Sequence, residues 1–278
     1  MSLPNFIGIG EMRCGTTWFY HVLRSHPQIY MPENIKEIWF FTDYWDKGVD
    51  WYKRFFPTEI EENSYKAIGE FSPIYIRSEN AAMRARQTVP NAKLIVILRN
   101  PVDRLESLYL KDQRDADEVP DFETWLKENP LAYTSGFYAS NLIKWLQFFP
   151  KEQFFITTLE EAAQNPEKIF AHLAGFLNVH SDGFNQNLMF KKVNSGASRY
   201  RFHGLYRMGL KAREWTRKHD FNRVSGLIAR VGKKIIKENG QAERKSNIDR
   251  EKFLQFYIED IEELEHLMNI NLSHWKMG

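Results

Sequence analysis

The chain has 278 residues, of which 43% are hydrophobic and 15% aromatic, so it can build the core of one α/β domain spanning residues 1–278. A net charge of +2 is too small to indicate nucleic acid as a partner. The single cysteine, Cys14, excludes a disulfide within the chain and favours a reducing compartment. No apolar run approaches the ~20 residues of a membrane span, and no secretion signal is recognisable, so we expect a cytoplasmic protein without a membrane partner.

Apolar runs and helical periodicity predict strands and helices that alternate along the chain. In chain order we expect a strand at 6–9, a helix at 16–25, strands at 67–70 and 92–98, a helix at 102–111, a strand at 154–157, a helix at 166–177 and an amphipathic helix at 250–268. Alternation of this kind predicts an α/β fold with a parallel central sheet flanked by helices. Residues 191–278 begin with a stretch rich in lysine and arginine, and we expect them to form a basic loop and a helical C-terminal extension of the same domain.

The first strand and the first helix are joined by Gly-Glu-Met-Arg-Cys-Gly-Thr-Thr, residues 10–17. This glycine spacing is that of a phosphate-binding loop, whose backbone N–H groups bind an anion at the start of a helix. Thr16 stands where a nucleoside-triphosphate loop has the lysine that reaches the terminal phosphates, and the nearest cation is Arg13. We therefore expect a nucleotide ligand, but not ATP used as a phosphoryl donor. A glycine turn with a threonine N-cap would explain the same residues.

A second polar segment, Arg-Asn-Pro-Val-Asp-Arg-Leu-Glu-Ser at residues 99–107, follows the predicted strand at 92–98. Arg99 could hold a second phosphate together with Ser107, because a guanidinium forms paired, charge-assisted hydrogen bonds with phosphate oxygens. Ligands of parallel sheets bind at the carboxyl ends of the strands, so this segment and the loop at 10–17 can face one ligand. Taken alone, a surface arginine and a solvated helical serine would also explain the segment.

The two motifs in this order resemble those of the sulfotransferases that use 3′-phosphoadenosine 5′-phosphosulfate (PAPS). Further similarity to the family, chiefly to its heparan-sulfate-type members, is found in Lys-Glu-Ile-Trp-Phe-Phe at 36–41, in Ile-Gly-Glu-Phe-Ser-Pro-Ile-Tyr at 68–75, in the helix that begins Gly-Phe-Tyr at 136–138 and in the stretch 264–275. The resemblance spans nearly the whole chain. It implies a sulfotransferase fold like that of P-loop kinases, PAPS as the cofactor, 3′-phosphoadenosine 5′-phosphate (PAP) as the product, and no metal.

The resemblance also implies which residues bind the nucleotide. The first loop would hold the 5′-phosphosulfate, and the arginine and serine of the second motif would hold the 3′-phosphate. A late loop in the basic stretch would cover that phosphate, although a solvated run of charges would explain the same stretch. The residues expected at the nucleotide are Arg13, Cys14, Gly15, Thr16, Thr17, Trp18, Arg99, Ser107, Tyr138, Ser195, Gly196 and Arg199.

Three residues are expected to take part in the chemistry. The glutamate that matches Glu37 acts in the family as the base that removes the acceptor proton, so the resemblance implies that role here. Lys36 would lie close to the sulfonate. Arg13 stands where the family usually has lysine; it stays charged and can stabilise the leaving oxygen, but it is a poor proton donor. An exposed Glu37 paired with Lys36, and a purely electrostatic Arg13, are the alternatives.

Aromatic residues next to the expected base could form the wall of an acceptor pocket. The candidates are Trp39, Phe40 and Tyr44, together with Glu70 of the segment 68–75. Trp39 replaces a histidine of the family, so no equivalent of that histidine is expected to assist the base. Core packing is the alternative, and for Phe40 it is the favoured one.

These features predict an enzyme that moves the sulfuryl group from PAPS to a hydroxyl or an amine by in-line attack. The acceptor is expected to be a small molecule, such as a bacterial alkaloid, toxin or polyketide. A glycan, or an acyl chain on an acidic carrier protein, is the alternative acceptor. A P-loop kinase is a further alternative, but it would have lysine at position 16 and an acidic Mg²⁺ ligand at a strand end. The sequence does not indicate an oligomeric state.

Overall fold

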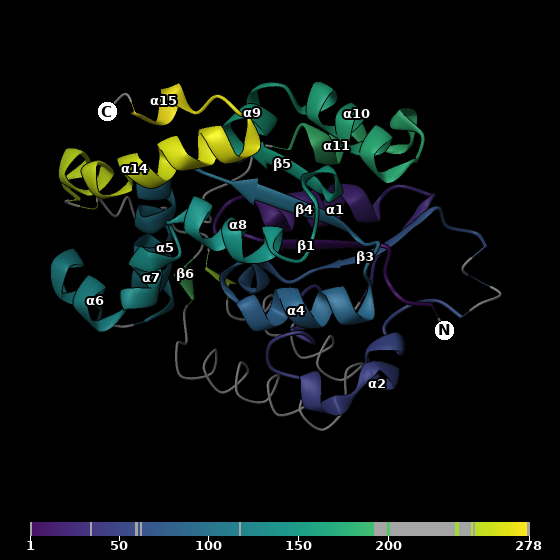
Figure 1. The fold of residues 1–278 in the computed structure, drawn as a ribbon. Coiled ribbons are helices and arrows are strands. Elements are labelled where there is room, and N and C mark those ends of the chain that lie inside the picture. The colour runs from purple at the N-terminus through teal and green to yellow at the C-terminus, as the bar shows by residue number, and fades with distance from the viewer. Residues whose placement is uncertain are drawn as a thin grey trace.

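The computed structural model describes residues 2–191 apart from 34, 59, 60, 62 and 117, together with 199–200, 237–238, 246 and 248–276. A sheet of five parallel strands in the order β2-β3-β1-β4-β5 lies at its centre (Figure 1). These strands are β1 (Phe6–Gly10), β2 (Ile29–Tyr30), β3 (Ala67–Phe71), β4 (Lys93–Leu98) and β5 (Phe154–Thr158). A separate antiparallel pair consists of β6 (Arg199–Tyr200) and β7 (Lys237–Glu238).

Helices pack against both faces of the central sheet (Figure 1). The α-helices of the described chain are α1 (Thr16–Arg24), α2 (Val49–Lys53), α4 (Glu79–Thr88), α5 (Pro101–Asp115), α6 (Phe122–Glu128), α7 (Pro130–Thr134), α8 (Tyr138–Leu146), α9 (Leu159–Gln164), α10 (Pro166–Leu177), α11 (Gln186–Met189), α14 (Arg250–Met268) and α15 (Ser273–Lys276). Short 3₁₀ helices are η1 (Trp45–Lys47), η2 (Pro73–Arg77), η3 (Lys151–Gln153) and η4 (Ser181–Gly183).

Successive residues of the central strands point to opposite faces, and each face has its own apolar core. Ile7 of β1 and Val96 of β4 belong to the larger core, together with residues of α4, α5, α8 and α14. Phe6 and Ile95 belong to the smaller core, together with residues of α1 and α10. Burial on both faces explains why β1 and β4 are continuous apolar runs. The predicted parallel sheet flanked by helices is confirmed.

Each predicted strand and helix is present, although the bounds differ by a few residues. The largest difference is in α5, which was expected at 102–111 and extends from Pro101 to Asp115. The sequence did not predict β2, which has two residues, or α4. The buried face of α4 consists of Ala81, Ala82 and Ala85, whose side chains are too small to give a clear apolar period.

The strand order brings the two predicted phosphate-binding segments together. From β1 the chain continues to β2 and β3 on one side, and β4 and β5 then lie on the other side. The strands that follow β1 are thus added first on one side of it and then on the other, so the strand order reverses between β1 and β4. Ligands of parallel sheets bind at such a point. The loop at 10–17 follows β1, and Arg99 follows β4, so both segments start at this point.

The C-terminal helix α14 packs against α8 and α5. The carboxylate of Asp260 accepts hydrogen bonds from the backbone N–H groups of Ala139 (2.9 Å) and Ser140 (3.1 Å), in the first turn of α8. These N–H groups have no acceptor within their own helix, so Asp260 satisfies them across the helix–helix contact. Beyond α14, the backbone oxygen of Trp275 accepts a hydrogen bond from Asn100 Nδ2 at 3.2 Å.

A buried carboxylate at the end of β3 fastens the segment 36–41 to the sheet. Glu70 is fully buried and accepts hydrogen bonds from the hydroxyls of Tyr52 (3.1 Å), Tyr75 (3.0 Å) and Ser72 (2.6 Å). In turn, Ser72 Oγ accepts from the backbone N–H of Trp39 at 3.2 Å. The Tyr75 hydroxyl likewise accepts from the N–H of Phe41, at 3.3 Å.

The expectation that Glu70 contacts the acceptor is corrected by this geometry. A fully buried carboxylate with three hydroxyl donors has no side available for a ligand. Phe40 is also fully buried, and its ring stacks on that of Tyr52 with centroids 4.3 Å apart. Both residues hold the segment 36–41 in position, as the core-packing alternative for Phe40 proposed.

Glu70 should make stability depend on pH. Burial raises its pKa from the ordinary value to about 7, against the lowering effect of its hydroxyl donors. The folded state then binds one proton more than the unfolded state between about pH 4.5 and pH 7, so this stabilising contribution is present at low pH and is lost as the pH rises through 7. Relative to Glu70→Gln, the wild-type free energy of unfolding should fall by about 2–3 kcal/mol between pH 5 and pH 8.

Urea denaturation of both proteins at the two pH values measures this difference. Glu167→Gln, at an exposed position of α10, is the control and should follow the wild type at both pH values. Parallel pH dependences of wild type and Glu70→Gln would contradict the assignment.

Candidate active site

The loop between β1 and α1 has the geometry of an anion-binding site. Gly15 has φ +84°, and a Cβ atom there would lie 2.6 Å from Leu159 Cδ1, so only glycine fits without strain. No backbone N–H of Gly15, Thr16 or Thr17 donates a hydrogen bond to any residue that the structure describes. These N–H groups lie at the start of α1, where the helix dipole favours a negative charge.

A lysine from another segment reaches this loop. Lys36 Nζ lies 3.2 Å from Thr16 Oγ1 and 3.1 Å from Thr17 Oγ1. It also lies 3.2 Å from Oε1 of Glu37. The loop itself contains no lysine, so the fold supplies an ammonium group to the threonine hydroxyls from residue 36. This is the position expected for a cation close to a sulfonate.

Glu37, the predicted base, has a second partner that the sequence did not reveal. Trp39 Nε1 donates to its Oε2 at 3.2 Å. Trp39 has φ +59°, an uncommon conformation for a large residue, and its backbone is bonded to Ser72. We had expected that the replacement of histidine by Trp39 would leave the base unassisted. The indole N–H instead holds the carboxylate, with 27% of the Glu37 side chain exposed.

In the second motif, Asn100 and Pro101 start a helix, while the side chain of Arg99 has no described partner. The side chain of Asn100 accepts from the N–H groups of Val102 (3.0 Å) and Asp103 (3.3 Å), and Pro101 occupies the first helical position. The guanidinium of Arg99 makes no hydrogen bond or ion pair with any described residue. The sequence pattern therefore combines a structural pair of residues with an available cation.

Arg13 connects the two motifs. Its Nε and Nη2 atoms lie 3.1 Å and 2.8 Å from Ser107 Oγ. Burial lowers its pKa, and the neighbouring charges of Arg114 and Arg99 lower it further. Because these arginines repel one another, an anion between them would be stabilised. Arg13 was expected beside the leaving oxygen, and in this structure its guanidinium lies at the serine predicted for the 3′-phosphate.

Two of the predicted nucleotide-binding residues have buried side chains that pack behind the loop and the second motif. Tyr138 and Cys14 are fully buried, and the Tyr138 hydroxyl donates to the backbone oxygen of Arg99 at 2.8 Å. Cys14 Sγ lies 3.9 Å from the same hydroxyl, and burial raises the pKa of the thiol, so it stays protonated. Neither side chain is available to a ligand, so a nucleotide would meet only the backbone at these two positions. Tyr138 instead positions the backbone of Arg99.

Trp18 and Tyr44 have mainly packing roles in the structure. Trp18 Nε1 donates to the backbone oxygen of Leu188 at 2.9 Å, and its ring makes an edge contact with Phe170. Tyr44 is 9% exposed, and its ring packs on Trp51 with centroids 5.3 Å apart. Trp18 thereby fastens α1 to α11 and α10, while its half-buried ring still borders the loop.

Three predicted residues are beyond what the structure describes. Ser195 and Gly196 lie outside the described residues, and of Arg199 only the backbone is described, in β6. Within the described part of the chain, no group of three or more histidine, cysteine or acidic side chains could hold a metal ion. None of the described helices combines the length and the hydropathy needed to cross a membrane.

Comparison with known proteins identifies the family. A model of the sulfotransferase domain matches residues 4–200. The chain belongs to the sulfotransferase domain family. It is 41% identical over 137 residues to the membrane-associated sulfotransferase kil1 of Dictyostelium discoideum. This match covers 48% of this chain and 27% of that protein. It is 31% identical over 196 residues to the human bifunctional heparan sulfate N-deacetylase/N-sulfotransferase 2. This match covers 64% of this chain and 22% of that protein.

The matches therefore span about a quarter of the length of these relatives. The fold is similar to that of a sulfotransferase from Alicyclobacillus acidocaldarius, with a TM-score of 0.65 at 23% identity over 99% of this chain and 100% of that chain. The predicted family and sulfotransferase fold are confirmed. The roles of the individual site residues stay predictions.

Arg99→Ala should weaken binding of PAP by about 2–3 kcal/mol, the scale of a hydrogen bond to a charged group. Isothermal titration calorimetry measures the change. Arg54→Ala removes an exposed arginine next to α2 and should leave the affinity unchanged. An unchanged affinity in Arg99→Ala would remove this residue from the 3′-phosphate site.

Proposed function

We propose that the chain transfers the sulfuryl group from PAPS to a hydroxyl or amine of a small acceptor. The observation that carries this proposal is the contact of Lys36 with both threonine hydroxyls of the loop and with Glu37. A cation at the phosphate-binding loop and a carboxylate beside it supply the two functions that in-line transfer requires. They are stabilisation of the leaving oxygen and removal of the acceptor proton.

The residues at the loop fit PAPS without a metal ion. The free N–H groups of Gly15, Thr16 and Thr17 would hold the 5′-phosphate, and Arg99 with Ser107 and Arg13 would hold the 3′-phosphate. When bound, PAPS supplies an electrophilic sulfur atom and a phosphate leaving group. Ordinary P-loop kinases instead need a loop lysine and an acidic Mg²⁺ ligand.

We assign the proton transfer to Glu37. Its carboxylate would accept the proton of the attacking hydroxyl or amine as the new bond to sulfur forms. Lys36 would stabilise the electron pair that remains on the bridging oxygen as the old bond breaks. Trp39 is a positioning residue in this proposal, because its N–H holds one carboxylate oxygen while the other faces Lys36.

The acceptor that we propose is a small molecule, for example a bacterial secondary metabolite. A glycan is the alternative, because the human relative is named as a heparan sulfate N-sulfotransferase. An acyl chain on an acidic carrier protein is a second alternative. A cytoplasmic location stays a prediction, and one relative is named as membrane-associated.

We further propose that residues 1–278 form one domain. The support comes from two contacts of the C-terminal part. Asp260 of α14 accepts hydrogen bonds from backbone N–H groups in the first turn of α8, and the backbone oxygen of Trp275 accepts one from Asn100 in the second motif.

Glu37→Gln should lower kcat at least ~100-fold, the usual contribution of a general base. Binding of PAP should stay unchanged, because Glu37 is not expected to contact the nucleotide. Transfer of labelled sulfate from PAPS, compared with transfer of labelled phosphate from ATP, measures the activity. The control is Glu33→Gln, an exposed glutamate paired with Arg24 near the same segment. Normal turnover in Glu37→Gln would exclude it as the base, and transfer from ATP alone would overturn the proposed function.

A further inference from the structure

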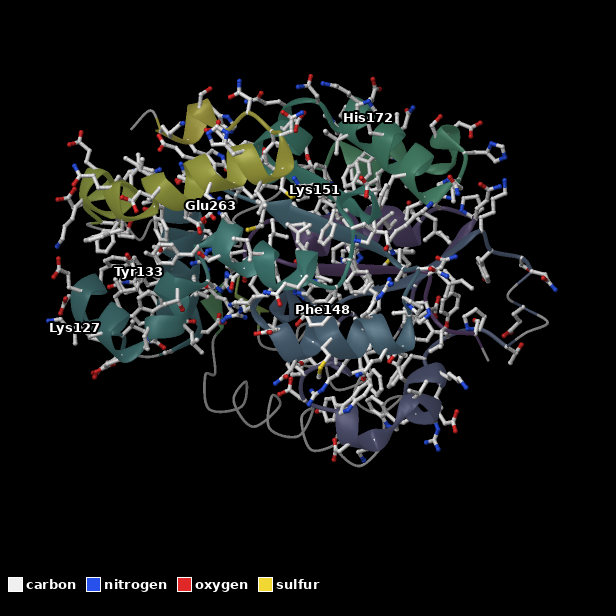
Figure 2. All side chains as sticks on the ribbon, in the orientation of Figure 1. Lys127, Tyr133, Phe148, Lys151, His172 and Glu263 are labelled. Carbon is white, nitrogen blue, oxygen red and sulfur yellow. The ribbon has the colours of Figure 1, made fainter. Side chains whose placement is uncertain are left out.

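A cavity of about 290 Å³ lies next to the nucleotide loop. Met12 lies in its wall, and so do Arg104, Leu108 and Asp112, which are spaced four residues apart on one face of α5. The rest of the wall comes from η2, α6, α7 and their connections, including Arg77, Trp125 and Leu131. In Figure 2 this end of the molecule is marked by Lys127 of α6 and Tyr133 of α7.

A second cavity of about 300 Å³ continues the first one. Asp112, Trp125 and Asn129 contribute to both walls, and the second cavity extends to Asp115 and Val119. Volumes of this size are at the lower end of those that hold small ligands. The two cavities together form an elongated site along α5.

This site is distinct from the predicted nucleotide site but adjoins it. None of the described residues expected at the nucleotide lies in either wall. Met12 directly precedes Arg13, however, and Leu108 directly follows Ser107. A molecule in the cavity could therefore approach a nucleotide at the loop from the side of α5.

The wall contains polar atoms that lack partners. Glu11 is fully buried, and its Oε2 accepts no hydrogen bond from any described residue, although Arg77 Nε lies 3.7 Å away. Nε of Arg104, which is 1% exposed, has no hydrogen-bond partner among the described residues either. Buried polar groups of folded proteins are usually satisfied, so these two shielded atoms are exceptions next to the cavity.

The accessible charges of the walls are mainly negative. They comprise Asp112, Asp115 and Glu128, whereas the accessible cation is Arg77, which already faces Glu11. Lys111 and Arg114 neutralise Asp112 and Asp115 from outside the walls, at 2.9–3.3 Å. Glu128 is exposed and forms no ion pair with any described residue, so its charge is not compensated.

We infer that these cavities are the acceptor site and that the acceptor is a small, amine-bearing molecule. Its ammonium group would lie at Glu128, an apolar body would pack on Leu108 and Trp125, and the group to be sulfated would face Met12. A polyanionic glycan is disfavoured, because its negative charges would meet the carboxylate of Glu128. The inference rests on the proposed sulfuryl transfer for its link to chemistry, but the binding preference can be measured without it.

Three phenols of similar size test the preference: tyramine, which is cationic, 4-ethylphenol, which is neutral, and 3-(4-hydroxyphenyl)propanoate, which is anionic. Without nucleotide, tyramine should bind ~10-fold more tightly than the propanoate and ~3-fold more tightly than ethylphenol, the scale of one partly exposed ion pair. Glu128→Gln should abolish most of the preference. Glu263→Gln, at an exposed position of α14 that Figure 2 labels, makes the same change elsewhere and should preserve it.

Leu108→Trp should fill the first cavity and abolish binding of all three phenols, while PAP binding confirms that the variant is folded. Equal affinities, a preference for the propanoate, no binding of any phenol, or unchanged binding in Leu108→Trp would each overturn the inference. Failure of the proposed function looks different. In that case tyramine would still be preferred, but no sulfate would pass to it from PAPS.

Discussion

The geometry of the candidate site depends on how the segment 36–41 is held against the carboxyl edge of the sheet. Glu70 at the end of β3 accepts hydrogen bonds from three hydroxyls. Two of these hydroxyls, those of Ser72 and Tyr75, accept hydrogen bonds from the backbone N–H groups of Trp39 and Phe41. Lys36 and Glu37 lie just before these anchored positions. A mobile segment could not keep an ammonium group within hydrogen-bond distance of two loop hydroxyls, because fixing such a side chain costs conformational entropy. The buried aromatic stack of Phe40 on Tyr52 adds to the same anchor.

The arrangement of cations explains how the site can lack a lysine in its loop. Lys36 supplies a point charge at the threonine hydroxyls, and Arg13 is turned toward Ser107. In the proposed site, lysine and arginine would thus divide the two phosphate positions between them. An ammonium group suits a single oxygen that gains charge, and a guanidinium suits the paired oxygens of a phosphate monoester.

The site and the adjoining cavities share α5. Ser107 and Leu108 are consecutive on this helix, so a nucleotide and an acceptor would contact neighbouring positions of one rigid element. Asn100 and Pro101 start the helix at a defined residue, which fixes the register of all these side chains relative to β4. The connection would also place the proposed acceptor beside α5, next to the residues predicted for the nucleotide.

Local patterns were enough to predict β1, β3, β4 and β5, the phosphate-binding loop, the second motif and the family. A continuous apolar run that ends in glycine or arginine has the same meaning wherever it lies in the fold, because backbone geometry and burial act over a few residues. The roles of Glu70, Tyr138 and Cys14 could not be obtained in this way. A carboxylate or hydroxyl in a motif looks the same whether it faces a ligand or a buried partner, and its partners here come from distant segments. Glu37 shows the same limit, since its contact with the Trp39 indole occurs where the chain turns at Trp39 with a positive φ. The sequence thus carries the identity of the chemistry, while burial and long-range contacts determine which of the candidate side chains are free to perform it.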